Sequence, residues 1–310
     1  MEEMARVFER ELDAPSPVLK TLVRHASRYR GKRLRSAQVL LVGKSLGPLD
    51  PEHVPVAAIV EMIHTATLVH DDVLDHAVLR RRLPSINARY GNSNAVLLGD
   101  YIYARAFSLS TRLRSQLASR LLSDVTRRIC EGEIEQAAAR FEFDLPQGRY
   151  LELIEAKTAS LYEAACRLGA AYAGGDAAPV DSAASYGRNV GIAFQIIDDC
   201  LDFDGTEAVV GKSLGTDLEA GRMTLPLLRL LESLSTRDRM RVKENALGDG
   251  VEKRAARLAA EFDLRPAIEE SLQVADGFVR EALAALDAFP PSPCRDSLST
   301  MAEFVLLRRW

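Results

Sequence analysis

Two groups of aspartates in this chain share the spacing DDxxD. The first group is Asp71, Asp72 and Asp75, and the second is Asp198, Asp199 and Asp202. On a helix, residues i and i+4 lie on one face, about one turn apart, so the first and third aspartates of each group can point the same way. Carboxylates this close repel one another and require a nearby positive charge. Magnesium supplies it, because it binds through one or two carboxylates together with substrate phosphates. The pattern therefore predicts magnesium held with a diphosphate between two facing clusters.

A solvated acidic helix end is the alternative interpretation of each motif. Two copies, each at the end of an apolar segment, weaken it. Acids at a helix C-terminus also oppose the helix dipole, so a functional reason is expected for them. Calcium is disfavoured because the sequence has no EF-hand loop.

Two basic clusters accompany the acidic motifs. Lys32, Arg33 and Arg35 precede an apolar segment, and three arginines follow the first motif at 80–82. Arginine binds phosphate oxygens bidentately, and lysine adds a point charge. In a chain of net charge −4, two such clusters predict two anionic groups. The alternative is that these arginines are solvated surface residues without a ligand, which applies best to Arg82.

His64 lies seven residues, or two helical turns, before the first motif and can share its acidic face. A lone histidine on an apolar helix is more often a satisfied core residue. From the residues alone, both interpretations of His64 stay open.

The elements that carry these residues are predicted to be helices. The segments 54–72, 94–110 and 189–202 are apolar on almost all sides, which is typical of helices inside a bundle. The sequence shows no regular alternation that would indicate strands. Proline- and glycine-containing breaks separate the helices but are too short for an interdomain linker. We therefore expect one all-α domain over 1–310, a helical bundle around a central cavity.

The segment 204–226 is long for a connection and contains four glycines. Long loops in compact domains are usually functional, and this one directly follows the second acidic motif. We predict an active-site lid, with a surface excursion as the alternative.

Composition excludes several classes of protein. The 310 residues are 47% hydrophobic and 27% charged, which is ordinary for a globular protein. The net charge gives no reason to expect nucleic acid as a partner. No apolar run approaches ~18 residues, so no membrane span is expected. The charged N-terminus lacks the apolar core of a signal peptide, and the four cysteines form no CxxC pair. We expect a cytoplasmic protein without a zinc site.

The motifs and their order resemble the trans-isoprenyl diphosphate synthases, nearly from end to end. The matching segments are GKRLR at 31–35, EMIHTATLVHDDVLD at 61–75, LRR at 79–81, GD at 99–100, KTASL at 157–161, FQIIDDCLD at 194–202 and GKSLGTDLEAGRMTLP at 211–226. Arg30, Ser36, Arg82 and Leu83 depart from the usual pattern, but no metal ligand is lost.

The resemblance implies roles for particular residues. Both aspartate motifs would hold the diphosphate of an allylic substrate through magnesium, as a cluster of three ions. Further contacts to that diphosphate would come from Arg80, Lys157, Thr158, Gln195 and Lys212. The diphosphate of isopentenyl diphosphate would be bound by Lys32, Arg33, His64 and Arg81. Ionisation, condensation and elimination would follow, the proton passing to the departing diphosphate.

Product length depends on the residues one turn before the first motif. Ala66 and Thr67 are small, whereas short-chain members of the family often carry an aromatic there. The first motif also lacks a two-residue insertion seen in many short-chain enzymes. These features favour a C30–C50 product, with a shorter product, chiefly C20–C25, as the alternative.

The resemblance implies a homodimer.

The sequence leaves alternatives to a self-sufficient synthase. A catalytic subunit that needs a second, different chain is an alternative, whereas a non-catalytic subunit would usually lose aspartates. A class I terpene cyclase also uses DDxxD, but its second motif fits poorly, because Asp202 and Thr206 occupy its last two key positions.

Overall fold

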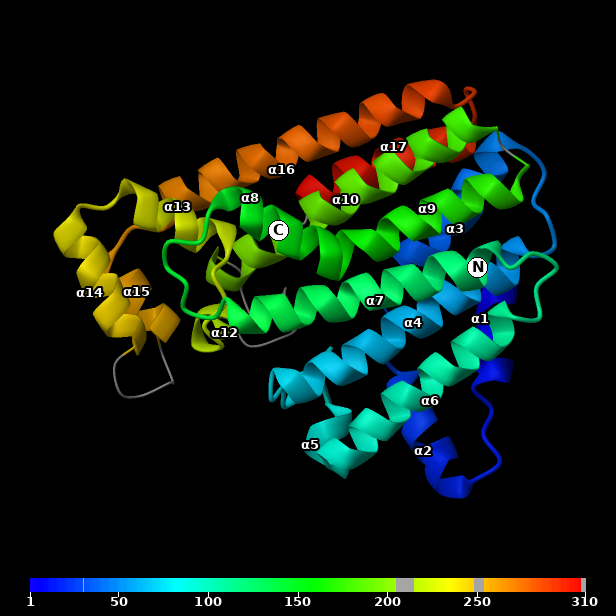
Figure 1. Cartoon of the computed structure of the whole chain (residues 1–310), viewed down its shortest axis with the longest axis horizontal. Coiled ribbons are helices and arrows are strands. Elements are labelled where there is room, and N and C mark those ends of the chain that lie inside the picture. The colour runs from blue at the N-terminus through cyan, green and yellow to red at the C-terminus, as the bar shows by residue number, and fades with distance from the viewer. Residues whose placement is uncertain (30, 175, 205–214, 248–253, 308–310) are drawn as a thin grey trace. The chain divides into compact units, whose positions relative to one another are not determined.

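The computed structural model describes residues 1–29, 31–174, 176–204, 215–247 and 254–307, and over these it is almost entirely helical (Figure 1). The predicted all-α class is confirmed. The contacts within the described residues divide the chain into two compact units. Unit 1 contains Met1–Thr126, Leu161–Gly187 and Ala285–Ser299, and unit 2 contains Arg127–Ser160, Arg188–Ala284 and Thr300–Trp310. The single domain around a central cavity stays a prediction.

The elements that lie wholly or partly in unit 1 come mainly from the first half of the chain. They are α1 (Glu2–Glu11), α2 (Pro17–Ala26), α3 (Leu34–Leu46), α4 (His53–Leu74), β1 (Leu79–Arg80), β2 (Leu83–Pro84), α5 (Ile86–Tyr90), α6 (Asn92–Ser110), α7 (Leu117–Ala138), α9 (Ser160–Tyr172), α10 (Ala177–Asp204), the 3₁₀ helix η2 (Leu286–Ala288) and α17 (Pro293–Leu307). The helices α7, α10 and α17 are divided between the two units, and α9 and α16 each place one terminal residue, Ser160 and Ala285, in the other unit.

Helix α4 forms the core of unit 1. It packs against α6, α3 and α1. Its apolar residues from Val56 to Ile63 include a run with no exposed surface at all. This agrees with the apolar character that predicted a buried helix at 54–72, since a helix that is apolar all round must be enclosed by others. The same prediction for 94–110 fails in this chain, because α6 exposes 42% of Val96 and 65% of Leu97.

Unit 2 contains the remaining helices. They are α8 (Gln147–Ile154), the π-helix η1 (Glu155–Ala159), α12 (Thr216–Glu219), α13 (Leu225–Ser233), α14 (Thr236–Leu247), α15 (Arg254–Glu261) and α16 (Arg265–Ala285). Within this unit α13 packs against α8, and α15 packs against both α12 and α14 (Figure 1). Ile196 and Ile197, near the end of α10, are completely buried.

The strands β1 and β2 form a small antiparallel hairpin that the sequence did not indicate. Leu79 pairs with Pro84 and Arg80 with Leu83. Two-residue strands are too short to produce an alternating pattern. The two residues at the turn, Arg81 and Arg82, both have left-handed backbone conformations, with φ of 51° and 65°. Tight hairpins need this geometry because it matches the twist of the strands.

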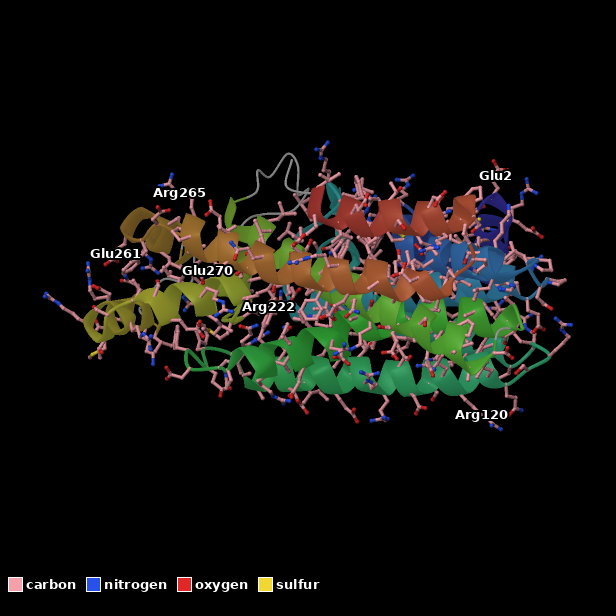
Figure 2. The ribbon with its side chains drawn as sticks, turned by 90° about the horizontal axis from the view of Figure 1, so that it is seen from above. Glu2, Arg120, Arg222, Glu261, Arg265 and Glu270 are labelled. Atoms are coloured by element: carbon pink, nitrogen blue, oxygen red, sulfur yellow. The ribbon has the colours of Figure 1, made fainter. Side chains whose placement is uncertain are left out.

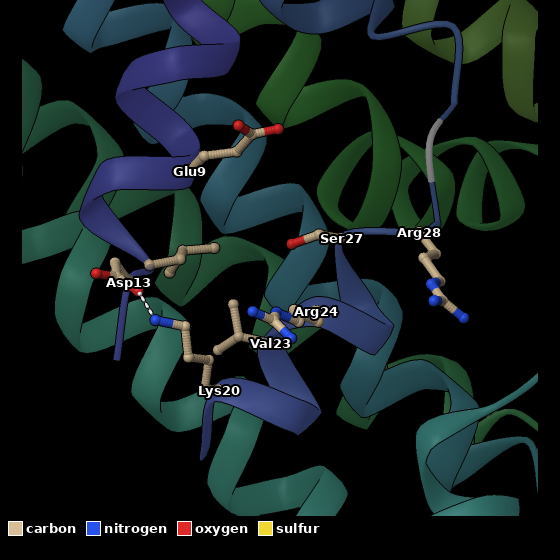
Figure 3. Close-up of a pocket in the computed structure, with 8 residues that line it drawn as sticks. Glu9, Asp13, Lys20, Val23, Arg24, Ser27 and Arg28 are labelled. Carbon is tan, nitrogen blue, oxygen red and sulfur yellow. Dashed lines mark ion pairs between the residues drawn. The ribbon is translucent and has the colours of Figure 1, made fainter. Parts of the chain in front are cut away.

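None of the helices in the described ranges is long and apolar enough to span a bilayer. A cavity of about 440 Å³ lies between α1 and α2 (Figure 3). Its lining includes an ion pair of 2.9 Å between Asp13 and Lys20, and it contains none of the predicted site residues.

Candidate active site

The first aspartate motif occupies the last turn of α4. The three carboxylates differ in exposure: Asp71 is half-buried, Asp75 is exposed, and Asp72 has no exposed surface. One oxygen of Asp72 accepts hydrogen bonds from Arg80, at 2.8 Å from Nε and 2.5 Å from Nη2. Burial raises the pKa of Asp72, and the charge of Arg80 opposes that rise. Asp72 therefore holds Arg80, whereas Asp71 and Asp75 are more exposed to solvent.

Several of the predicted basic residues gather within unit 1. Arg35 Nη1 lies 3.3 Å from His64 Nε2, and its guanidinium carbon lies 4.0 Å from the centre of the Tyr162 ring. The guanidinium of Arg81 covers Gly31 so closely that a Cβ at that position would collide with it. The segment 31–35 and the hairpin therefore converge near His64, and a side chain at position 31 would displace the Arg81 guanidinium.

The surroundings of His64 disfavour its protonated form. Burial, followed by the charges of Arg35, Arg81 and Arg80, lowers the pKa of His64 well below its ordinary value. A neutral imidazole can donate a hydrogen bond to a phosphate without competing for its charge. Sequence reasoning did not single out Arg35 as a ligand, although it belongs to the predicted basic cluster. Arg33 instead begins α3 with a left-handed φ of 50°, and Lys32 is exposed.

The second motif lies in the last turns of α10 and belongs to unit 2. Asp198 is half-buried, whereas Asp199 and Asp202 are buried. Asp199 accepts hydrogen bonds from Tyr150 Oη at 2.6 Å and from Gln195 Nε2 at 2.7 Å. Gln195 in turn accepts one from Thr158 Oγ1 at 2.8 Å. Burial and the negative charge of Asp217 raise the pKa of Asp199 to about 8. Tyr150 has no motif around it, so only the fold reveals this partner.

Asp202 binds the segment that follows it in unit 2. Its carboxylate accepts hydrogen bonds from the backbone N–H of Asp217 at 3.0 Å and from Thr216 Oγ1 at 3.3 Å. The carboxylate of Asp217 accepts a hydrogen bond of 2.7 Å from Arg222, whose side chain is labelled in Figure 2. The described end of the predicted lid is thus attached to the third aspartate. Lys212 and the rest of 205–214 lie outside the described residues.

Lys157 and Thr158 project from the π-helix η1. Lys157 Nζ lies 2.7 Å from Glu133 Oε1 and donates a hydrogen bond of 3.0 Å to Gln136 Oε1. π-Helices are short, rare and frequent at functional sites. Glu155, the first residue of η1, forms ion pairs with Arg128 at 3.3 Å and Arg188 at 2.5 Å. No sequence pattern predicts a π-helix, so this geometry was not foreseen.

Helix α7 approaches η1 very closely at Gly132. A Cβ there would lie 2.9 Å from the Cβ of Ala156 and 3.1 Å from the backbone N of Lys157. We expect Gly132→Ala to push η1 away from α7 and so to displace Lys157, which the resemblance assigns to the allylic diphosphate. This should lower kcat by about tenfold to a hundredfold, because small displacements of a group that positions substrate are costly. Steady-state kinetics would measure this.

Gly277→Ala is the matched control for Gly132→Ala. Gly277 lies inside α16, and a Cβ there would meet nothing within 4 Å. Alanine is the better helix former, so we expect this control to keep its activity and to gain about 0.5–1 kcal/mol of stability. Equal activity of the two variants would contradict the role given to the contact at Gly132.

The predicted chain-length residues lie two turns inside α4. Ala66 is completely buried, and Thr67 is half-buried with its hydroxyl donating to the His64 carbonyl at 2.8 Å.

The residues of both motifs fit a hard, oxygen-binding cation. Among the described residues, no group of three or more His, Cys, Asp or Glu side chains is arranged to hold a metal ion. Magnesium does not need such a group, because one or two carboxylates, water and substrate phosphates complete its octahedron. The accessible carboxylates of Asp71, Asp75 and Asp198 provide oxygen ligands of this kind.

Comparison with known proteins gives consistent results. A family model described as polyprenyl synthetase matches residues 16–261. Heptaprenyl diphosphate synthase component 2 of Geobacillus stearothermophilus is 38% identical over 302 residues, which cover 96% of this chain and 92% of that protein. Octaprenyl diphosphate synthase of Escherichia coli is 35% identical over 279 residues, covering 90% and 86%.

A solved structure is also very similar. Polyprenyl synthase from Caulobacter crescentus CB15, in complex with calcium and isoprenyl diphosphate, superposes with a TM-score of 0.94 and 35% identity, covering 100% of this chain and 95% of that one. The motifs, the all-α fold and these matches have one explanation: the chain belongs to the polyprenyl synthetase family.

Proposed function

We propose that this protein is a magnesium-dependent prenyltransferase that condenses isopentenyl diphosphate with an allylic diphosphate, head to tail. The observation that carries the proposal is the division of labour within the two DDxxD motifs. Each motif keeps at least one aspartate buried on a protein partner and another accessible. The heptaprenyl and octaprenyl diphosphate synthases to which the chain is similar support the same reaction class.

We expect Asp71, Asp75 and Asp198 to bind magnesium directly. When bound, the metal would neutralise negative charge on the diphosphate as it leaves. Asp72, Asp199 and Asp202 would act on the protein side instead, because each is buried and hydrogen-bonded to a neighbouring residue. Three ions, as the resemblance implies, remain a prediction.

Cationic and polar side chains would bind the two substrates. Arg80, Lys157, Thr158 and Gln195 would contact the allylic diphosphate and stabilise its charge as the C–O bond breaks. Isopentenyl diphosphate would be held by Lys32, Arg33, His64 and Arg81. We add Arg35 to this set because it contacts His64.

The reaction then needs few proton-transfer groups on the protein. The π electrons of isopentenyl diphosphate form the new C–C bond to the allylic cation. The proton lost from the adjacent carbon passes to the released diphosphate. The protein positions both substrates and excludes water, for which closure of the 204–226 segment remains our prediction.

We expect a C30–C50 product, because the small side chains of Ala66 and Thr67 would not block a chain that grows along α4. Fourteen helical residues span ~21 Å, which is enough for several isoprene units. Ala66→Phe is expected to shorten the product, which chromatography of the labelled chains would measure. Thr67→Phe tests the adjacent, less buried position, and the near-isosteric Thr67→Val should leave the length unchanged. Unchanged length in both phenylalanine variants would count against this prediction.

The test of the function is incubation of purified protein with magnesium, labelled isopentenyl diphosphate and farnesyl diphosphate. A product series ending at C30–C50 supports a self-sufficient long-chain synthase. A series ending at C20–C25 supports the shorter alternative.

A heteromeric enzyme is the second candidate. It is favoured by one observation, the similarity to a protein named component 2 of a heptaprenyl diphosphate synthase. Absence of product from the chain alone, with activity restored by a second subunit, would support it. The predicted homodimer and cytoplasmic location stay predictions.

A further inference from the structure

The hairpin of β1 and β2 carries two of the arginines assigned to substrate binding. Both residues of its turn, Arg81 and Arg82, have left-handed backbones without being glycine. Side chains with a Cβ disfavour this conformation, which persists only where surrounding contacts impose it. The contacts that hold the hairpin therefore determine where its arginines point.

The last turn of α2 and the residues just after it provide two of these contacts. His25 Nε2 lies 2.7 Å from the backbone oxygen of Pro84 in β2, and Tyr29 Oη donates to the same oxygen at 3.3 Å. A carbonyl oxygen can only accept, so Nε2 of His25 carries the proton in this contact. Both side chains are buried, with 4% and 6% of their surface exposed. The Tyr29 and Tyr90 rings meet the imidazole edge-on, at centroid distances of 5.7 and 5.4 Å.

The hairpin also binds back to the same segment. Arg81 Nη1 donates a hydrogen bond to the backbone oxygen of Tyr29. Arg80 is held separately, by the buried carboxylate of Asp72. Arg80 thus has an anchor on α4, whereas Arg81 depends on the junction between the hairpin and the end of α2.

We propose that His25, assisted by Tyr29, is a positioning residue for Arg81. It fixes the Pro84 strand of the hairpin, so that the Arg81 guanidinium stays over Gly31 and near His64. The proposal rests on the proposed function, in which Arg81 binds isopentenyl diphosphate. His25 itself touches no substrate in this role.

The test is His25→Phe, which keeps the aromatic packing and removes the hydrogen-bond donor. The KM for isopentenyl diphosphate is expected to rise about tenfold with little change in kcat, because the binding group is displaced while the ionising site is not. The KM for the allylic substrate should rise less, since Asp72 holds Arg80. His25→Gln, which restores an N–H donor, should recover most of the affinity. Calorimetric titration with isopentenyl diphosphate in the absence of the allylic substrate provides a readout independent of turnover.

His53→Phe is the matched control for a loss of stability alone. His53 is also buried, places Nε2 3.0 Å from a backbone oxygen, that of Gly169, and packs edge-on against Tyr172. It should lower the melting temperature as His25→Phe does but leave the KM unchanged. Equal rises in KM for both variants, or none for His25→Phe, would overturn the proposal.

Arg81→Ala separates this proposal from the function on which it rests. If Arg81→Ala raises the KM and His25→Phe does not, only the role of His25 is wrong. If Arg81→Ala also leaves the KM for isopentenyl diphosphate unchanged, the assignment of Arg81 to that substrate fails as well.

Discussion

Asp71→Asn is expected to lower kcat by about a thousandfold, a loss of roughly 4 kcal/mol of transition-state stabilisation. Asparagine keeps the size of the side chain and removes the negative charge that we propose binds magnesium. Because Asp71 is only half-buried, the melting temperature should change little. Asp198→Asn, in the second motif, should behave in the same way. Product formation at saturating magnesium, together with circular dichroism, would measure both effects.

Asp181→Asn is the matched control for a lost surface charge. Asp181 is an aspartate of α10 whose side chain is exposed and pairs with Arg167 at 3.0 Å. It should keep wild-type turnover, since exposed ion pairs contribute little. Turnover retained by Asp71→Asn and Asp198→Asn would refute the metal-binding assignment.

Arg80→Met is expected to destabilise the protein by about 3–5 kcal/mol, because it removes one partner of a buried ion pair. The side chain of Asp72 has no exposed surface and that of Arg80 only 23%. Without the arginine, a carboxylate remains buried with no counter-charge. Chemical denaturation would measure the loss of free energy of unfolding, and activity should also fall.

The pH dependence of this variant identifies the cause. Burial already raises the pKa of Asp72 with Arg80 present, and removing Arg80 should raise it further. The folded state then binds more protons than the unfolded state, so stability falls as pH rises from about 4 through the raised pKa. The variant should therefore lose less stability at pH 5 than at pH 8.

The double variant Asp72→Asn with Arg80→Met provides the rescue. It removes the buried charge together with its partner, so most of the stability should return while activity stays low. A double variant as unstable as Arg80→Met would show that packing, not charge, caused the loss.

Local spacing alone predicted the helices that carry the two acidic motifs. Two DDxxD groups at the ends of apolar segments predicted both helices and their acidic ends, because helical periodicity depends only on sequence separation. The apolar segments 54–72 and 189–202 are indeed helical in α4 and α10. The resemblance in the motifs was enough to predict the family that the comparisons confirm.

Only the tertiary structure decided which aspartates of each motif are buried and which residues they contact. The sequence gives no reason to distinguish the six aspartates of the two motifs. In the structure, however, Asp72 accepts a hydrogen bond from Arg80 and Asp199 accepts one from Tyr150. Tyr150 lies 49 residues before Asp199 in the sequence. The π-helix that contains Lys157 and the hairpin that contains Arg81 follow no periodic sequence pattern. Burial and hydrogen bonding between distant segments are properties of packing, so no local pattern could encode them.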